Sequence, residues 1–159
     1  CIAFLDNDDA NSDSARAELL EQVSEGVITG PVVEKIYAEY KKSEEENLKM
    51  IDETIEVFSA GNYKIAIAFA HNLQSNMACS YIKNKTGASI QIFVTTKDWS
   101  AHVRSDAGID SSVLSASLGG NGHPQASGFT LKPEASDLTE SIKWYTNIVK
   151  SKAKDVLDH

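Results

Sequence analysis

The sequence predicts an α/β fold, in which a mixed β-sheet flanked by helices is preceded by a long helical connector. Three observations predict it. Strand-like and helix-like segments alternate along the chain, Tyr63–Ala70 has the pattern of a buried strand, and apolar residues follow helical spacing from Val33 to Phe58. The chain has 159 residues, of which 42% are hydrophobic and 24% charged, enough for one domain plus a helical extension.

Composition excludes several classes of protein. The longest apolar run, residues 65–70, is too short to span a bilayer, so no membrane association is expected. Cys1 and Cys79 make neither a disulfide framework nor a zinc site, which predicts a reducing, cytoplasmic compartment. The net charge of −8 argues against a protein that coats long nucleic acid but allows a small basic pocket for a nucleotide.

The N-terminal residues combine a short apolar run with an acidic cluster made of Asp6, Asp8 and Asp9. This spacing would suit metal ligands, but no glycine or glutamate completes a calcium loop, so a strand end with a solvated turn is favoured. A helix is then expected, capped by Ser12 or Ser14 and ending near Glu25, before Gly26.

A long helix is expected between Pro31 and Phe58. Proline suits the first turn of a helix, and the apolar positions that follow have helical spacing. Residues 43–47 are polar all round, so the middle of this helix is expected to cross solvent. Its length of about 40 Å, at about 1.5 Å per residue, is that of a connector between domains.

Gly61-Asn62 is expected to end this helix, and shorter elements follow. In order they are a strand at Tyr63–Ala70, a helix at His71–Lys85 capped at His71-Asn72 and closed by Gly87, a hairpin of Ser89–Thr96 and Ser100–Ser105 around Lys97–Trp99, a helix at Ser111–Leu118 capped by Asp110 or Ser111, a strand at Phe129–Leu131, and a closing helix at Ser136–Lys154.

The segment from Gly119 to Phe129 carries the most chemical information. Gly119, Gly120 and Gly122 would leave backbone amides bare, and such a loop can form a concave nest of N–H donors for an anion. His123 adds a hydrogen bond or, when protonated, a positive charge, and Pro124 could begin a helical turn that favours phosphate. The ordinary alternative is a glycine-rich turn with an exposed histidine.

Arg104 and Ser105 lie at the end of a predicted strand. Arginine can bind phosphate through two parallel hydrogen bonds or stack on a base, although a surface ion pair is the ordinary role for one arginine. His102 is expected on the same strand face as Arg104, near the pocket, although an ordinary half-exposed histidine fits equally.

Residues 100–129 resemble the DHH-associated C-terminal domain of DHH-family phosphoesterases. That family shows Arg-Ser at a strand end, a short helix, and then a run of glycines followed by His, two variable residues, Ala, a small residue, Gly and Phe. The match here consists of Arg104, Ser105, Gly119, Gly120, Gly122, His123, Ala126, Gly128 and Phe129, and the order of elements extends it to roughly residues 60–155. Asn121 replaces a usual glycine, and Asn tolerates positive φ better than most residues.

The resemblance implies that residues 59–159 bind substrate, and that residues 1–58 are a helical connector and the end of a missing catalytic domain. Two divalent metals, usually manganese, would lie in that missing domain, which would also offer a surface for a homodimer. No catalytic or metal-binding residue is expected in this chain. The implied substrate-binding residues are Arg104, Ser105, Gly119, Gly120, Asn121, Gly122 and His123. The start at Cys1 rather than Met indicates processing or a piece of a longer chain.

The implied function is substrate binding for a metal-dependent phosphoesterase or exonuclease of the oligoribonuclease, phosphoadenosine-phosphate phosphatase and exopolyphosphatase-like group. The ligand would be a short oligonucleotide or another small nucleotide phosphate. Polar residues at Gln74–Asn76 are either further substrate contacts or ordinary polar residues of a helix N-terminus. Two alternatives remain open: a non-catalytic module for nucleotide binding or assembly, and a domain like the C-terminal part of alanyl-tRNA synthetase.

Overall fold

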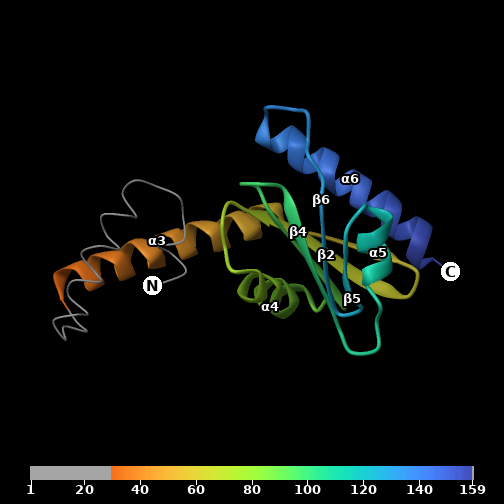
Figure 1. Ribbon diagram of the computed structural model, residues 1–159, viewed down its shortest axis with the longest axis horizontal. Coiled ribbons are helices and arrows are strands. Elements are labelled where there is room, and N and C mark those ends of the chain that lie inside the picture. The colour runs from red at the N-terminus through yellow and green to blue at the C-terminus, as the bar shows by residue number, and fades with distance from the viewer. Residues whose placement is uncertain (1–29, 159) are drawn as a thin grey trace. The chain divides into compact units, whose positions relative to one another are not determined.

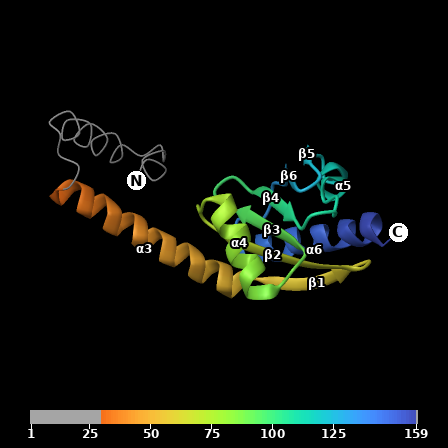
Figure 2. The same ribbon diagram turned by 90° about the horizontal axis from the view of Figure 1, so that it is seen from below.

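The computed structural model describes residues 30–158 of the chain (Figures 1 and 2). The expectations for Asp6, Asp8 and Asp9 and for the helix near Ser14–Glu25 lie outside the described residues. Contacts divide the chain into residues 1–46 and residues 47–159, and the sheet and all features of the site belong to the second unit.

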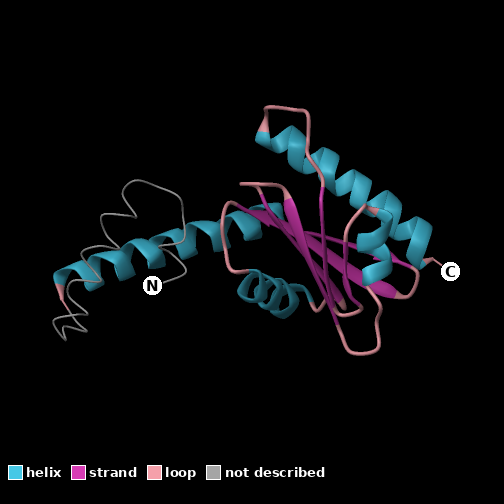
Figure 3. Ribbon diagram, viewed as in Figure 1, coloured by secondary structure: helices cyan, strands magenta, loops and turns pink. Residues whose placement is uncertain are grey.

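The predicted fold class is confirmed: a mixed six-stranded sheet is flanked by helices and preceded by a helix (Figure 3). The strand order is β1-β2-β3-β4-β6-β5, with β2 and β3 parallel and every other neighbouring pair antiparallel. The elements are α3 (Pro31–Thr54), β1 (Glu56–Ala60), β2 (Tyr63–Ala70), α4 (Ser75–Thr86), β3 (Ile90–Thr95), β4 (Ser100–Ser105), α5 (Ser112–Ser117), β5 (Asn121–His123), β6 (Ala126–Thr130) and α6 (Leu138–Leu157).

Strand β2 shows how the sheet divides the core into two layers. Side chains alternate between the faces of a strand, and all of residues 65–70 are buried. Ile65, Ile67 and Phe69 pack in the cluster that includes α5 and α6, whereas Ala66, Ala68 and Ala70 pack with α4 and the end of α3. Figure 2 shows α4 and α6 on opposite sides of the sheet. Because both faces of β2 are covered, its sequence is an apolar run without alternation.

The predicted long helix ends earlier than expected, and the prediction that it reaches Phe58 is wrong. Helix α3 ends at Thr54, whose hydroxyl donates to the carbonyl of Met50 (2.8 Å) and accepts from the amide of Phe69 (3.0 Å). Val57 and Phe58 instead pair with Ala66 and Ile65 in the antiparallel β1–β2 hairpin. Gly61-Asn62 is therefore a hairpin turn rather than a helix terminus.

Helix α4 begins at Ser75, later than the predicted His71, and is closed by Gly87 as predicted. The residues before it form a bend, because the amide of Asn72 donates to the buried side-chain oxygen of Asn47 (2.9 Å). At the other end Gly87 adopts a left-handed conformation, and its amide donates to the carbonyl of Lys83 (2.8 Å).

The elements after β4 depart modestly from their predicted bounds. The predicted helix near 111–118 is α5, and the closing helix is α6, capped by the carboxylate of Asp137, which accepts from the amide of Glu140 (2.8 Å). Part of the glycine cluster, expected to be a loop, forms the edge strand β5 (Asn121–His123), and the strand expected at 129–131 is β6, which begins at Ala126. No helix among residues 30–158 has the length and apolar character needed to cross a membrane.

The predicted hairpin of β3 and β4 is confirmed, and Asp98 organises its turn. The carboxylate of Asp98 accepts from the amide of Ser100 (3.0 Å) and from the hydroxyl of Thr95. Partial burial by itself would raise the pKa of Asp98, but the hydrogen bonds from Ser100 and Thr95 outweigh it and lower the pKa to about 2.

We expect the stability that Asp98 contributes to be lost in acid. Since its folded-state pKa is about 2, below the ordinary 3.8, the contribution is present above pH 3.8 and disappears as the pH falls towards 2. The measurement is the urea midpoint of the wild type and Asp98→Asn at several pH values. Asp155→Asn, at an exposed position of α6, is the matched control. A wild-type advantage over Asp98→Asn that stays constant down to pH 2 would contradict the assignment.

Candidate functional site

Register across three strands places four polar side chains on one face of the sheet. Arg104 of β4 pairs with Ala126 of β6, which pairs with His123 of β5. Neighbouring strands are about 4.8 Å apart, so Arg104 and His123 flank Ala126 across about 10 Å. The next row on this face has the same form, with small Gly128 between His102 and Asn121. We call these two rows the β4–β6–β5 face.

Helix α4 covers only part of this side of the sheet. It contacts β2, β3 and β4, while α5 contacts β5 and β6 from the opposite face. An open pocket of about 560 Å³ lies over the β4–β6–β5 face, with His102, Asn121 and Gly128 in its lining together with Gly119, Gly120 and Gly122. The small residues at the centre of each row leave this volume open.

Arg104 is partly buried and is held by neutral acceptors. Its guanidinium donates to the side-chain oxygen of Asn76 (3.1 Å) and to the carbonyl of Val103 (3.0 Å). Within residues 30–158 no carboxylate forms an ion pair with Arg104. The ordinary role of a surface arginine, an ion pair with a carboxylate, is therefore not seen among the described residues. The charge of Arg104 is therefore available to an anion.

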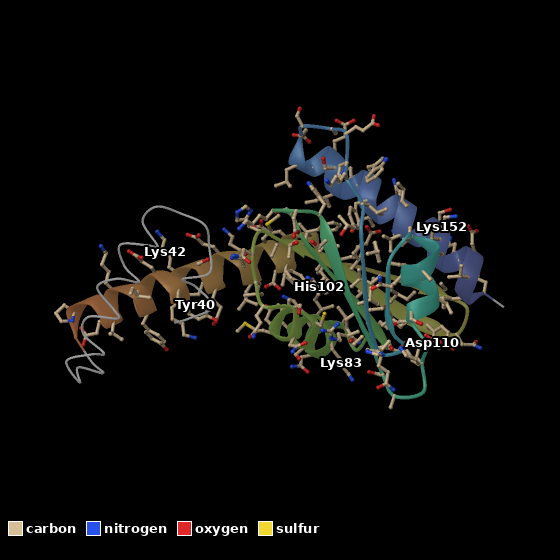
Figure 4. All side chains as sticks on the ribbon, viewed as in Figure 1. Tyr40, Lys42, Lys83, His102, Asp110 and Lys152 are labelled. Carbon is tan, nitrogen blue, oxygen red and sulfur yellow. The ribbon has the colours of Figure 1, made fainter. Side chains whose placement is uncertain are left out.

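His102, labelled in Figure 4, is partly buried and lies against an aromatic ring. The imidazole stacks on Phe93 at 6.2 Å between ring centroids, with an angle of 20° between planes. Burial lowers its pKa, and the neighbouring Arg104 lowers it further, against a smaller opposing effect of Asp98. At neutral pH the His102 side chain is thus a neutral hydrogen-bonding group rather than a second cation.

The expectation that the glycine loop leaves its amides bare is wrong for two of the residues. The amide of Gly119 donates to the carbonyl of Ala116 (3.1 Å), and that of Gly120 donates to the carbonyl of Ser115 (2.8 Å). The reason is local, because the last turn of α5 exposes carbonyls that need donors. Pro124 also begins no helix, since it lies in the turn between β5 and β6.

Close approach of backbones explains two of the glycines better than anion binding does. A Cβ on Gly120 would lie 2.0 Å from the carbonyl oxygen of Gly128, and one on Gly122 would lie 2.4 Å from the Cα of Ser127. Asn121 between them is not in a left-handed conformation; the one non-glycine residue with positive φ in the described part of the chain is Trp99. The glycines thus let β5 pack directly on β6 and α5.

Ser105 and His123 are placed differently from the rest of the predicted set. The hydroxyl of Ser105 donates to the carbonyl of Ile109 (2.8 Å), with the carbonyl of Pro124 at 3.3 Å, so it ties the loop before α5 to the β5–β6 turn. Ser105 follows Arg104 in β4 and therefore points to the opposite face. His123 is exposed and shares a row with Arg104. It lines neither the open pocket over the β4–β6–β5 face nor a smaller pocket beside Arg104.

The sequence reasoning missed a second hollow next to Arg104, on the α4 side. Its volume is about 250 Å³, and Asn76, Ser80, Lys83 and Gln91 line it together with Cys79 and Arg104. A signal was present: Gln91 is the one polar residue among the apolar residues 90–94 of β3. Among the residues that the structure describes, no three His, Cys, Asp or Glu side chains are grouped so as to hold a metal ion.

Two solved structures share the fold of this chain. A pGpG-specific phosphodiesterase from Vibrio cholerae is 12% identical, with a TM-score of 0.53 over 96% of this chain and 54% of that chain. An exopolyphosphatase-related protein from Bacteroides fragilis is 17% identical, with a TM-score of 0.52 over 89% of this chain and 44% of that one. This chain thus spans about half the length of these proteins. No curated protein matched the sequence.

The family itself is shown by a sequence model. The DHHA1 domain model matches residues 61–150, more than half of the chain, and this segment contains all seven predicted substrate-binding residues as well as Gln91. The match falls within the 60–155 region that the Arg-Ser and Gly-His motifs indicated and confirms that resemblance. The chain belongs to the DHHA1 domain family, the DHH-associated domain of phosphoesterases.

Proposed function

We propose that this chain binds the phosphate group of a short oligonucleotide or small nucleotide on its β4–β6–β5 face, as the substrate-binding part of a metal-dependent phosphoesterase. The observation that supports it best is Arg104, a partly buried guanidinium with neutral partners and with no carboxylate partner among the described residues. A guanidinium held in this way offers several N–H donors in a planar fork, which suits phosphate.

The size and charge of the site favour a short ligand. The chain carries a net charge of −8, so a long polyanion would meet general repulsion, whereas one phosphate could sit beside Arg104. One structural neighbour is named for pGpG and the other for a relationship to exopolyphosphatases. Both pGpG and polyphosphate carry phosphate. In this proposal Asn121 and His123 contribute hydrogen bonds from β5, across β6 from Arg104.

Hydrolysis in this proposal needs metal ions that the described residues do not hold. In this proposal the two divalent ions are held by a domain outside this chain; no group of three candidate ligands is present in residues 30–158. When bound there, they would supply an activated water for attack on phosphorus. The part assigned to this chain is to bind and orient the phosphate.

We expect Arg104→Ala to weaken binding of guanosine 5′-monophosphate by about ten- to a hundredfold. The loss of a charge-assisted hydrogen bond costs about 1.5–3 kcal/mol, whereas the stability of the fold should change by less than about 1 kcal/mol. Arg104→Lys should restore affinity only in part, because lysine lacks the planar fork. Calorimetric titration of the 159-residue chain, together with urea unfolding, measures both effects.

Two controls separate a phosphate site from general attraction to a cation. Lys152→Ala removes an exposed cation from α6, which packs against the opposite face of the sheet, and should leave affinity unchanged. Guanosine, which lacks the phosphate, should bind the wild type no better than it binds Arg104→Ala. Equal binding of the monophosphate to wild type and Arg104→Ala would refute the proposal.

A further inference from the structure

The hollow beside Arg104 contains a buried amide whose hydrogen-bonding capacity is only partly used. We call this hollow the Gln91 pocket; it is lined by Asn76, Cys79, Ser80, Lys83, Gln91 and Arg104. Gln91 pairs in register with Arg104, so the two side chains are neighbours on one face of the sheet. The Gln91 pocket and the β4–β6–β5 face thus meet at Arg104.

Gln91 itself is 3% exposed. Its Nε2 donates to the carbonyl of Ala88 (2.6 Å), which fixes the orientation of the amide. Within residues 30–158 its Oε1 receives no hydrogen bond from the protein. A buried acceptor without a donor is costly, so an amide oxygen held in the lining of a pocket is suited to a donor on a ligand.

Apart from Arg104, the lining of the Gln91 pocket adds no free positive charge. The ammonium of Lys83 is bound to the carboxylate of Asp106 at 2.5 Å. The oxygen of Asn76 already accepts from Arg104, which leaves its amide N–H groups as donors. Burial raises the pKa of Cys79 to about 11, so this thiol is neutral. Hydrogen-bonding groups without net charge fit a nucleobase edge better than a second phosphate.

We propose that the Gln91 pocket binds the nucleobase of the ligand whose phosphate lies on Arg104; this inference rests on the proposed function. Glutamine and asparagine side chains recognise base edges by pairing one acceptor with one donor, and this pocket supplies both from Gln91 and Asn76. Its volume of about 250 Å³ is below the range of about 300–1,000 Å³ for whole-ligand sites, which suits one base rather than a whole nucleotide.

The test compares ligands that share a phosphate but differ in the base. The 159-residue chain is titrated with the four common nucleoside 5′-monophosphates, with ribose 5-phosphate and with pyrophosphate. The best nucleotide should bind about five- to a hundredfold more tightly than ribose 5-phosphate, the range of discrimination expected for a pair of hydrogen bonds to a base. Equal affinity of all monophosphates and ribose 5-phosphate would overturn the inference.

Two variants assign this preference to the pocket. Gln91→Met keeps the length of the side chain but removes both polar atoms, and Ser80→Leu fills the pocket from an exposed position of α4 without touching the core. Each should lower nucleotide affinity to that of ribose 5-phosphate and leave ribose 5-phosphate binding unchanged. Ser80→Leu keeps the test valid if Gln91→Met unfolds. Persistence of the base preference in folded Ser80→Leu would overturn the inference.

The pyrophosphate titration and the Arg104→Ala variant distinguish failure of the nucleobase assignment from failure of the proposed function. If pyrophosphate binds more tightly than every nucleotide and Ser80→Leu weakens it, the pocket holds a second phosphate and the nucleobase assignment is wrong. In that case Arg104→Ala still weakens the binding of all these ligands, so the proposed function stands. If Arg104→Ala weakens none of them, the proposed function itself has failed.

Discussion

Replacing Gly122 by alanine is expected to lower the free energy of unfolding by roughly 2–6 kcal/mol. Gly122 has a φ of +142°, where a side chain is strained by about 1–3 kcal/mol. Its new Cβ would also lie 2.4 Å from the Cα of Ser127 and 2.7 Å from the carbonyl oxygen of Ala126. Both atoms belong to a paired strand, and overpacking of this kind costs about 1–3 kcal/mol more.

Gly119→Ala is the matched control for this prediction. Gly119 also has a positive φ, +80°, but a Cβ there would meet no other heavy atom within 4 Å. Its variant should therefore lose only about 1–3 kcal/mol from strain. Urea unfolding compares the two, and amide exchange of β6 reports whether β5, a short edge strand, has detached instead. Equal unfolding midpoints with equal protection of β6 would contradict the close packing described here.

The outcome also bears on ligand binding. Asn121 and His123 lie on either side of Gly122 in β5, so displacement of this strand moves both side chains away from the row positions opposite His102 and Arg104. Gly122→Ala should then weaken phosphate binding, while Gly119→Ala, which keeps the strand in place, should not. The glycines would act on the ligand through the position of β5 rather than through an array of bare amides.

Most of the fold was predictable because its signals are local. The uninterrupted apolar run of β2 indicated a strand covered on both faces, and Gly87 indicated the end of α4. The turn at Lys97–Trp99 indicated the β3–β4 hairpin. The closing helix α6 followed from its apolar stripe. In each case the residues that carry the signal lie within the element that they define or directly at its end.

The elements that were missed depend on distant partners. Ile55 and Phe58 continue the helical spacing of α3, but residues 56–60 gain a complete antiparallel pairing with β2 as a strand. Likewise Asn121–His123 has few features of a strand by itself, and β5 exists because it pairs with β6. Intrinsic preferences of short segments are weak, and tertiary pairing overrides them.

The candidate site shows the same division. The family motif located Arg104 and His123, but not the fact that β6 places the small residue Ala126 between them. It assigned Ser105 to the ligand, whereas the hydroxyl of Ser105 bonds to loop carbonyls. Gln91 was missed, because one polar residue in a buried strand becomes informative only when its neighbours across the sheet are known.

The other large effect is expected at Tyr145, on the face of the sheet opposite the site. Tyr145 of α6 is completely buried among aromatic rings, in an edge contact with Phe69 (5.7 Å) and stacked on Phe129 (6.1 Å) and Trp99 (5.9 Å). Its hydroxyl donates to the carbonyl of Trp99 (3.1 Å), and burial raises its pKa. Removing the ring leaves a cavity, so Tyr145→Ala should destabilise the chain by roughly 3–5 kcal/mol.

Tyr145→Phe separates the ring from the hydroxyl. It keeps the stacking and leaves only the carbonyl of Trp99 without this donor, a loss of about 0.5–1.5 kcal/mol. Urea unfolding measures both variants, and titration with guanosine 5′-monophosphate follows the site. Phe129 connects Tyr145 to the candidate site, because it stacks on Tyr145 and lies next to Gly128 of the β4–β6–β5 face. Tyr145→Phe should therefore bind as the wild type does, and equal stability losses in the two variants would show that the hydroxyl, rather than the packed ring, supports α6.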